Sequence, residues 1–321
     1  MKVLLTGGAG FIGSCLLRIL NDIGINDVVI VDNIASTEKW KYLGDKKFSE
    51  YINKDKLFEK LPDLELFTNV IHIGACSSTT ETNFDYLYTN NFEYSKKLWK
   101  YCVEHQISFI YASSAATYGS GERGFSDENE IDEYLPLNGY GYSKQLFDLW
   151  VKEQILLPKQ YVGLKFFNVY GPNEYHKGSM ASVVYHGYKQ VKESGKIKLF
   201  KSYNLDYLDG GQLRDFIYVK DVCNVVKYFI NHPEINGLFN VGTGHAESFE
   251  TLAISVFKAL ELPEKIEYIP MPDYLKEKYQ YFTEASMNKL RSTGYNDSFY
   301  SLECGIKNYV CNYLEEGYKT Y

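Results

Sequence analysis

Short runs of apolar, β-branched residues alternate along the chain with longer amphipathic stretches. The short runs are bounded by polar residues or glycine, which is typical of buried parallel strands, and the longer stretches repeat their apolar positions every three to four residues, which is typical of helices. We expect strands at 3–6, 28–31, 70–73, 109–112, 162–167 and 238–241, and helices at 12–20, 86–104 and 142–156. This alternation predicts an α/β fold with a doubly wound parallel sheet, whose ligand lies beyond the carboxyl ends of the strands.

A glycine-rich segment follows the first expected strand and opens the first expected helix. Residues 7–13 read Gly-Gly-Ala-Gly-Phe-Ile-Gly and contain Gly8-x-Gly10-x-x-Gly13 as well as the wider Gly7-x-x-Gly10-x-x-Gly13. Glycines here let the backbone approach a pyrophosphate, while the free N–H groups at the helix start face the anion. Asp32 ends the second strand 19 residues after Gly13, where a carboxylate accepts ribose hydroxyls. The segment therefore predicts a Rossmann-type dinucleotide site.

The second expected strand leaves the choice between NAD and NADP open. Asp32 favours NAD, because a 2′-phosphate beside a carboxylate is a contact between like charges. Lys39 and Lys54 lie close enough in the sequence to reach that phosphate and offset the repulsion, although each also fits a solvated surface position.

The hydrophobic pattern weakens after residue 167, where a segment rich in Gly, Tyr and Lys begins. We expect residues 1–168 and 215–243 to form the dinucleotide-binding domain, and 169–214 and 244–321 to form a smaller, interleaved C-terminal substrate domain. Residues 203–212 are expected to form one exposed loop, and the acidic segment 127–133 a solvated loop rather than a metal site.

Composition and charge exclude several classes of protein. The chain has 321 residues with 34 Lys+Arg against 41 Asp+Glu, a net charge of −7, which argues against a nucleic-acid partner. The six cysteines are scattered without a C-x-x-C pair, so neither a disulfide framework nor a metal site is expected. No stretch reaches the ~18 apolar residues of a membrane span, and the glycines begin too early for a signal peptide. We expect a cytoplasmic protein with no membrane partner.

Tyr140 and Lys144 have the spacing that puts a phenol and an ammonium on one face of a helix. A nearby cation stabilises the phenolate, so we expect the pKa of Tyr140 to fall from about 10 toward neutrality, which suits a general base. The Tyr-x-x-x-Lys spacing occurs six times in this chain. Only Tyr140 opens an expected helix, 26 residues after Ser114 at the carboxyl end of a strand, where a hydroxyl can hold the substrate oxygen.

Taken in order, these motifs resemble those of the extended short-chain dehydrogenases/reductases that act on nucleotide sugars. The resemblance rests on residues 6–13, Ser113 and Ser114, Tyr140 and Lys144, and the late segment 214–222 (Arg-Asp-Phe-Ile-Tyr-Val-Lys-Asp-Val). More narrowly, the segments 74–81, 111–119, 167–172 and 176–183 are similar to those of the ADP-L-glycero-D-manno-heptose 6-epimerase family, and 239–248 and 279–283 extend the match.

The resemblance implies an isomerase that converts ADP-D-glycero-β-D-manno-heptose to the L-glycero epimer, a precursor of the lipopolysaccharide inner core. In this family C6 is oxidised to a ketone by a tightly bound cofactor, and hydride returns to the other face. Since one base does not easily serve both hydroxyl orientations, the family's second acid/base falls on Lys177. By the same resemblance Ser114 orients the substrate oxygen, Tyr140 acts as acid/base, and Lys144 tunes Tyr140 and holds the nicotinamide ribose.

The resemblance also implies which residues line the ligand sites. The family is linked to NADP rather than NAD, with Lys39 and Lys54 as its phosphate-binding lysines, and to homo-oligomers, commonly pentamers. Arg214 suits a diphosphate through its planar fork, with a structural ion pair as the alternative. The implied cofactor contacts are Gly7, Gly10, Phe11, Ile12, Gly13, Asp32, Asn33, Lys39, Lys54, Ile73, Gly74, Ala75, Cys76, Ser77, Asn90, Tyr140, Lys144, Val169 and Lys177; the implied substrate contacts are Asn168, Ser179, His186, Phe200, Arg214 and Tyr279.

Three other functions stay open on the sequence. A nucleotide-sugar dehydratase needs an acidic pair after the serine, where this chain has Ala115 and Ala116. A UDP-sugar 4-epimerase needs the same Ser, Tyr and Lys but only one base, and the segment 177–180 tells against it. A non-catalytic NADP sensor usually loses the Tyr or the Lys, and this chain keeps both.

Overall fold

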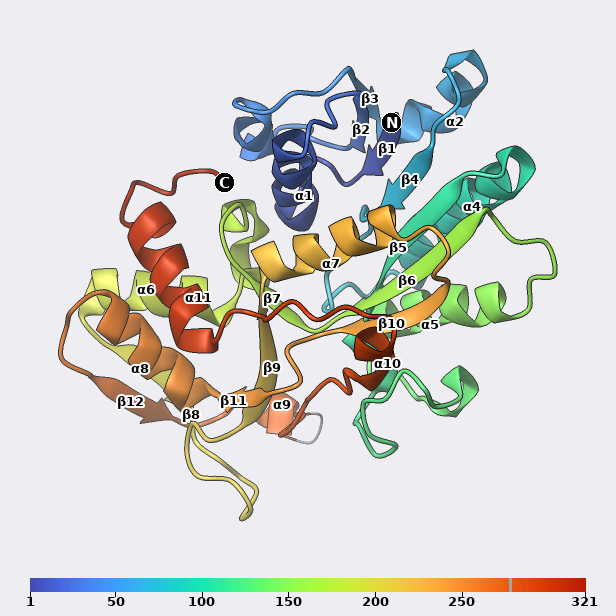
Figure 1. Cartoon of the computed structure of the whole chain (residues 1–321). Coiled ribbons are helices and arrows are strands. Elements are labelled where there is room, and N and C mark those ends of the chain that lie inside the picture. Colours follow the sequence, from blue (N-terminus) through green and yellow to red (C-terminus); the bar gives the residue numbers. More distant parts are fainter. Residues whose placement is uncertain (277–278) are drawn as a thin grey trace.

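The centre of the molecule is a seven-stranded sheet in which every neighbouring pair of strands is parallel (Figure 1). The computed structural model describes residues 1–276 and 279–321. The strand order is β10-β6-β5-β4-β1-β2-β3, so the sheet is wound outward in both directions from β1. The expected doubly wound α/β fold is confirmed, and the crevice for a ligand lies where the winding reverses, between β1 and β4. The strands are β1 (Val3–Thr6), β2 (Val28–Asp32), β3 (Glu50–Asn53), β4 (Asn69–His72), β5 (Ser108–Ser114), β6 (Gln160–Phe166) and β10 (Gly237–Val241).

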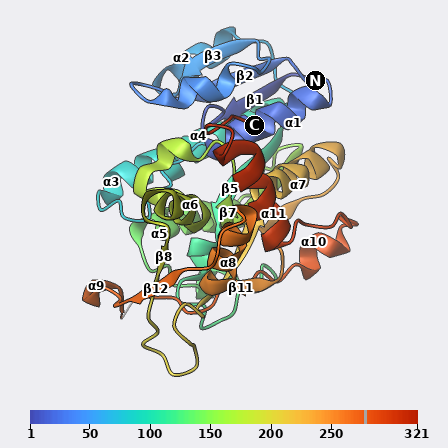
Figure 2. The same ribbon diagram turned by 90° about the vertical axis from the view of Figure 1, so that its left-hand side faces the viewer.

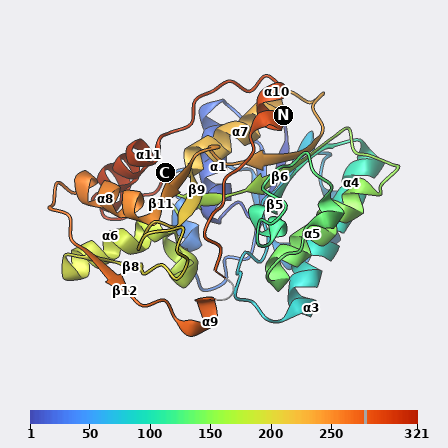
Figure 3. The ribbon, with the colours of Figure 1, turned by 90° about the horizontal axis from the view of Figure 1, so that it is seen from below.

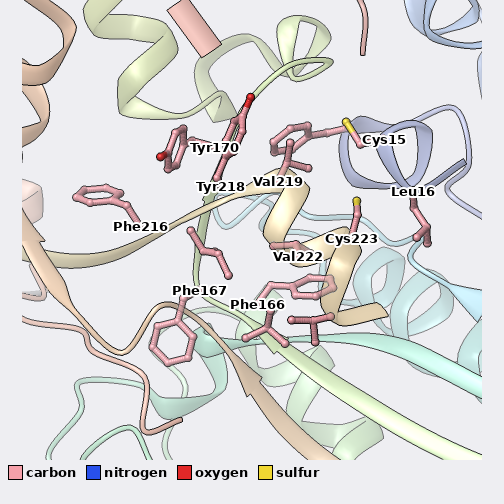
Figure 4. Packing of buried hydrophobic residues seen from close by; sticks show 14 of the residues in the cluster. Cys15, Leu16, Phe166, Phe167, Tyr170, Phe216, Tyr218, Val219, Val222 and Cys223 are labelled. Carbon is pink, nitrogen blue, oxygen red and sulfur yellow. The ribbon is translucent and has the colours of Figure 1, made fainter. Parts of the chain in front are cut away.

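Both faces of this sheet are covered, so its inner strands β1, β2, β4, β5 and β6 are buried at nearly every position. Alternate residues point to opposite faces, so Val3 and Leu5 join one core cluster while Leu4 joins the other. Helices α1 (Phe11–Asp22) and α7 (Val219–Asn231) pack together on the first face, where Figure 4 shows Cys15 and Cys223 among the buried side chains. The second face is covered by α4 (Tyr94–His105) and α5 (Gly139–Lys152), seen together in Figure 3.

Two smaller sheets and their helices form the other lobe of the molecule (Figure 2). One sheet has the order β11-β9-β7 and the other pairs β12 with β8. The chain enters this lobe after β6, returns to the main sheet through β9, α7 and β10, and then enters it again. The domain boundaries stay a prediction. The elements of this lobe are β7 (Asn168–Tyr170), β8 (Ile197–Phe200), β9 (Leu213–Tyr218), β11 (Ala246–Ser248), β12 (Ile266–Ile269), α6 (Val183–Ser194), α8 (Phe249–Ala259), α9 (Asp273–Lys276) and α11 (Leu302–Tyr309). Helix α10 (Asn288–Ser292) packs against β10 of the main sheet instead.

The remaining helical segments are short and lie mostly in the connections. The expected helix at 86–104 is present as three joined pieces, α3 (Phe84–Leu87), a π-helical turn η4 (Tyr88–Glu93) and α4. The others are η1 (Glu38–Leu43), η2 (Lys54–Lys56), α2 (Leu57–Lys60), η3 (Leu61–Asp63), η5 (Ala115–Tyr118), η6 (Ile131–Glu133), η7 (Tyr175–Met180) and η8 (Val310–Leu314). None of the helices in the described part of the chain combines the length and apolar character needed to span a membrane.

Some local expectations were wrong. Helix α5 covers 139–152 rather than 142–156, because Asn138 caps its start by accepting a hydrogen bond from the Gly141 N–H. Strand β3 was missed, since its residues Glu50–Asn53 are polar enough for an edge strand. The acidic segment 127–133 is not solvated throughout, because Asp127 is buried and accepts the backbone N–H of Asn240. Gly210 and Gln212 are likewise buried at the base of the 203–212 loop, whose Leu205 and Leu208 are exposed.

Candidate active site

The glycines of residues 7–13 form a cradle at the start of α1 that has no room for side chains. A Cβ atom on Gly13 would lie 2.1 Å from the carbonyl oxygen of Gly7, and one on Gly7 would lie 2.7 Å from the backbone of Gly74. Gly7 also has a φ of +70°, which favours glycine. Gly7, Gly10 and the first residues of α1 line a cavity, so the turn and the α1 N-terminus face the space for a ligand. This arrangement fits a dinucleotide pyrophosphate.

Asp32 ends β2 beside this cradle, as expected. Its Oδ2 accepts the Ala9 N–H at 2.9 Å, and its Oδ1 accepts the Asn33 N–H at 2.7 Å. The Lys39 ammonium, from η1, lies 2.6 Å from the same Oδ1. Lys54 donates to Asn90 Oδ1 at 3.1 Å on the neighbouring side. The two lysines that the sequence suggested for a 2′-phosphate therefore both line the end of the site where Asp32 lies.

A cavity of about 350 Å³ extends over the carboxyl ends of β1, β2 and β4. It is lined by all the residues expected to contact the cofactor except Tyr140, Lys144 and Val169, of which Val169 packs against the main core instead. The sequence did not single out five further lining residues, which come from strand ends, the α3–α4 region and the loop before Lys177: Thr6, Val31, Tyr86, Tyr94 and His176.

Ser114 and Tyr140 are hydrogen-bonded where the end of β5 meets the start of α5, and Lys144 lies four residues further along the same helix. A hydrogen bond with Ser114 acts on the Tyr140 phenol, but burial acts more strongly and raises the pKa of Tyr140 above its usual value. Burial also lowers the pKa of Lys144 to about 8, although Asp148 opposes this. We expected Lys144 to lower the pKa of Tyr140 toward neutrality. In the protein without ligands this expectation is wrong, because the pKa of Tyr140 is raised. Both groups lose water, and for each of them this loss outweighs the attraction or hydrogen bond that stabilises its charged form.

Asn91 connects the loop after β4 to helix α5, a contact that sequence reasoning missed. Its side-chain oxygen accepts the Cys76 N–H at 2.8 Å, and its Nδ2 donates to the Cys76 carbonyl at 3.0 Å and to Ser143 Oγ at 2.9 Å. Ser143 in turn donates to the carbonyl of Tyr140 at 2.7 Å. The only sign of this contact in the sequence is that Asn91, a polar residue, occupies a position of the expected helix 86–104 that faces the core.

Lys177 reaches the cavity from η7. Its ammonium lies 5.5 Å from the centre of the Phe11 ring, and its backbone N–H donates to the Glu174 carbonyl at 3.0 Å. Burial lowers the pKa of Lys177, and the buried carboxylate of Glu174 opposes this. Glu174 also holds the loop by accepting the Ser182 N–H and hydroxyl at 2.5 and 2.7 Å. Lys177 therefore lines the same cavity as the dinucleotide cradle.

Arg214, Tyr279 and Phe200 form a second group of expected residues, in the smaller lobe. The guanidinium of Arg214 lies 5.4 Å from the Tyr279 ring, which meets Phe200 edge to face at 6.5 Å. Arg214 donates to the carbonyls of Leu213 and Gln280. No carboxylate pairs with it among the residues the structure describes, so the alternative of a structural ion pair is not supported.

The other expected substrate contacts are more widely spread. Asn168 and Ser179 are exposed, and His186 is half-buried on α6 with its ring against Tyr185. Within residues 1–276 and 279–321, no hydrogen bond or ring contact joins these three side chains to Arg214 or Tyr279. In the same ranges no group of His, Cys, Asp and Glu side chains is arranged to hold a metal ion.

Comparisons with known proteins point to one family. A model described as the NAD dependent epimerase/dehydratase family matches residues 3–242. An ADP-L-glycero-D-manno-heptose-6-epimerase of Fusobacterium nucleatum is 50% identical over 324 residues, covering 97% of this chain and 98% of that protein. The crystal structure of the Helicobacter pylori ADP-L-glycero-D-manno-heptose-6-epimerase superposes with a TM-score of 0.80 at 29% identity, over 97% and 95% of the two chains. The UDP-glucose 4-epimerase of Thermus thermophilus, solved in complex with NAD, superposes with a TM-score of 0.77 at 25% identity, over 97% and 98%.

Proposed function

This chain belongs to the NAD-dependent epimerase/dehydratase family, and we propose that it inverts C6 of ADP-D-glycero-β-D-manno-heptose to form the L-glycero epimer. The product is a precursor of the lipopolysaccharide inner core. The relative that is named for this activity is 50% identical, and the alignment covers nearly the whole length of both proteins. The family match alone supports only the broader class of nucleotide-sugar epimerases and dehydratases.

One feature supports the proposal beyond the family: Lys177 lines the cavity, and Tyr140, from a distant part of the chain, lies beside its Cys76 wall. Tyr140 begins α5 next to Ser114, and it lies near enough to Cys76, which lines the cavity, for the thiol to affect the pKa of the phenol. Lys177 lines the same cavity from η7. A 6-epimerase needs an acid/base for each orientation of the C6 hydroxyl, and these two groups meet that need.

In the proposed reaction, Ser114, Tyr140 and Lys177 act on the C6 oxygen of the sugar. A nicotinamide held in the cavity would supply the hydride chemistry at C6, accepting a hydride from one epimer and giving it back to the ketone to form the other. Ser114 holds the C6 oxygen by a hydrogen bond. One of Tyr140 and Lys177 takes the hydroxyl proton as the C6–O bond becomes a carbonyl, the ketone turns, and the other returns a proton to the oxygen. Burial raises the pKa of Tyr140 and lowers that of Lys177, so in each side chain it favours the neutral form over the charged one.

We propose NADP as the cofactor, with NAD as the less favoured alternative. Lys39 pairs with Asp32, and Lys54, which pairs with Asp55, lines the same cavity, so that a 2′-phosphate there would have cationic partners. Lys144 would hold the nicotinamide ribose, and the lining residues of the cavity would hold the rest of the dinucleotide. Arg214, with Tyr279 and Phe200, would hold the ADP diphosphate, and Asn168, Ser179 and His186 would contact the sugar.

The proposal also covers the organisation of the protein. Residues 1–168 and 215–243 would bind the dinucleotide, and 169–214 and 244–321 the sugar nucleotide. We propose a cytoplasmic homo-oligomer, a pentamer by analogy with the family, without nucleic-acid or membrane partners.

The closest competing activity is 4-epimerisation of a UDP-sugar, because such an enzyme shares the fold at 25% identity. It needs Ser114, Tyr140 and Lys144 but gives Lys177 no role. A dehydratase lacks its acidic pair here, since Ala115 and Ala116 follow Ser114. A non-catalytic NADP sensor would have no use for the half-buried Tyr140 and Lys177.

The test is incubation of the purified protein with ADP-D-glycero-β-D-manno-heptose in deuterated water, followed by NMR of the sugar. We expect inversion at C6 without deuterium at that carbon, because hydride leaves and returns within one site. Tyr140→Phe is the matched control and should give no inversion. If the wild type binds NADP but inverts nothing, the heptose substrate is wrong, and inversion at C4 of UDP-glucose becomes the next measurement.

A further inference from the structure

A buried ion pair lies behind the catalytic residues and has no role in the reaction as described above. Asp148 on α5 and Lys165 on β6 are joined at 2.9 Å, and their side chains are 0% and 1% exposed. We propose that this pair is a positioning device that holds Ser114 and Tyr140 at the correct separation and thereby sets the turnover of the enzyme. The inference rests on the proposed epimerase function and assigns two further residues to it.

The Asp148 carboxylate ties α5 to the end of β5. Besides Lys165, its Oδ2 accepts the Ser113 hydroxyl at 2.6 Å, and its Oδ1 accepts the Tyr111 hydroxyl at 3.1 Å. Ser113 is the immediate neighbour of Ser114, and all four residues are buried. Hydrogen bonds to a carboxylate are stronger than those between neutral groups, so the carboxylate restrains β5 at the residue next to the catalytic hydroxyl.

Lys165 restrains the other side of Ser114. Its ammonium donates to Thr117 Oγ1 at 2.6 Å, and Thr117 Oγ1 donates to the Ser114 carbonyl at 2.8 Å. The ammonium also lies 5.0 Å from the centre of the Tyr118 ring. The backbone of Ser114 is therefore held from both sides, by Ser113 through Asp148 and by Thr117 through Lys165.

The same pair determines the orientation of the helix that carries the acid/base. Tyr140, Lys144 and Asp148 follow one another at four-residue intervals on α5, so they share one face of the helix. At ~1.5 Å per residue, Asp148 lies about 12 Å along the axis from Tyr140. A fixed point at that distance limits rotation of α5 about its axis, and a rotation would move the Tyr140 phenol away from Ser114.

A contribution to the stability of the fold does not explain why Asp148 and Lys165 are buried as an ion pair. Removing two charges from water costs several kcal/mol per ion, and an apolar pair of similar volume is often as stable or more stable. What an apolar pair would lack is the set of directional bonds to Ser113, Tyr111 and Thr117. Those bonds fix positions rather than add burial.

The experiment compares turnover, substrate KM, cofactor content and melting temperature in variants of the holoenzyme. For Asp148→Asn and Lys165→Met we expect kcat to fall about 100-fold, the usual cost of displacing a catalytic group by ~1 Å, with KM and cofactor content nearly unchanged. Lys165→Arg keeps the charge and the donors, so it should retain at least about ten times the kcat of Lys165→Met. The matched control is Asp221→Asn on α7, since Asp221 is an equally buried carboxylate whose hydrogen bond goes to the Tyr300 N–H. It should lower the melting temperature without lowering kcat.

Two milder variants keep the test decisive if the charge variants do not fold. Ser113→Ala and Thr117→Val each remove one neutral side-chain contact of the pair while leaving both charges in place, and each should lower kcat about tenfold at unchanged KM. Wild-type kcat in both, or in folded Asp148→Asn, would overturn the proposal, as would a fall in melting temperature alone. If the wild-type protein is inactive on ADP-heptose, the proposed function has failed rather than the positioning role. The same variants are then measured on 4-epimerisation of UDP-glucose, which also needs Ser114 and Tyr140.

Discussion

The proposed preference for NADP depends on the contact between Lys39 and Asp32. The Lys39 ammonium lies 2.6 Å from Asp32 Oδ1, and its side chain is 14% exposed, so the pair is partly shielded from solvent. A 2′-phosphate bound at this place meets a carboxylate and an ammonium together. Replacing Lys39 with Met removes the cation and leaves the carboxylate.

The magnitude follows from the two contacts. A hydrogen bond between charged groups contributes about 1.5–3 kcal/mol, which corresponds to about 10-fold to about 140-fold in Kd. The uncompensated Asp32 charge adds repulsion to this loss, so we expect the affinity for NADPH to fall at least about 100-fold in Lys39→Met. The affinity for NADH should change by less than about threefold, because its ribose hydroxyls donate to Asp32 and do not need the lysine.

The assay is fluorescence titration of the cofactor-stripped protein with NADPH and with NADH. Lys41→Met is the matched control, because Lys41 lies on the same η1 turn, pairs with exposed Glu38 and does not line the cavity. Lys54→Met should show a weaker loss of the same kind, since Lys54 reaches the cavity from the Asn90 side. Equal losses for NADPH and NADH in Lys39→Met, or no loss for either, would refute the reasoning.

The remaining predictions concern the catalytic groups and the cradle. Tyr140→Phe and Lys177→Met should each lower turnover by at least about 100-fold, the range for general acid–base groups, while the cofactor stays bound. Turnover is measured by NMR at C6 and cofactor content by absorbance. Full activity in either variant would show that the residue does not have its assigned role. Gly13→Ala puts a Cβ 2.1 Å from the Gly7 carbonyl oxygen, so the turn and the helix must separate by about 1.3 Å to reach ordinary contact. We therefore expect the purified variant to contain little cofactor. A normal cofactor content would contradict the cradle geometry. Burial lowers the pKa of Lys144 from 10.5 to about 8, so between these values the unfolded chain binds more protons and stability rises with pH. Relative to Lys144→Met, the free energy of unfolding of the wild type should therefore rise by about 1.4 kcal/mol from pH 7 to pH 9 in urea titrations, and parallel curves for the two proteins would show that Lys144 is not desolvated.

Much of the fold was predictable because it depends on local pattern. Strand β1 has the expected bounds, and Asp32 and Ser114 end their strands as expected. The errors lie where a local pattern is ambiguous. Strand β3 lies at the edge of the sheet and has one buried residue, so its sequence lacks the apolar run of an inner strand. The start of α5 depends on the side chain of Asn138, which caps the helix.

Nearly all the expected cofactor contacts lie around one cavity because a short turn and successive strand ends carry them. The glycine cradle and the four-residue spacing of Tyr140 and Lys144 are properties of neighbouring residues, so the sequence is sufficient to predict them. The resemblance to a family added Lys177 and Arg214, which no local pattern distinguishes from surface residues.

The electrostatics of the site were decided only by the tertiary structure. The pKa of a buried group depends on how much water it loses and on charges that lie far away in the sequence, which is why the expected lowering of the Tyr140 pKa was wrong. The same holds for the contact of Asn91 with Ser143 and for the ion pair of Asp148 with Lys165, since each joins elements from separate parts of the chain. The sequence by itself determined the turn, the strand ends and the helix face that carry the chemistry. Packing determined their charges and distances, because these depend on side chains that become neighbours only when the chain folds.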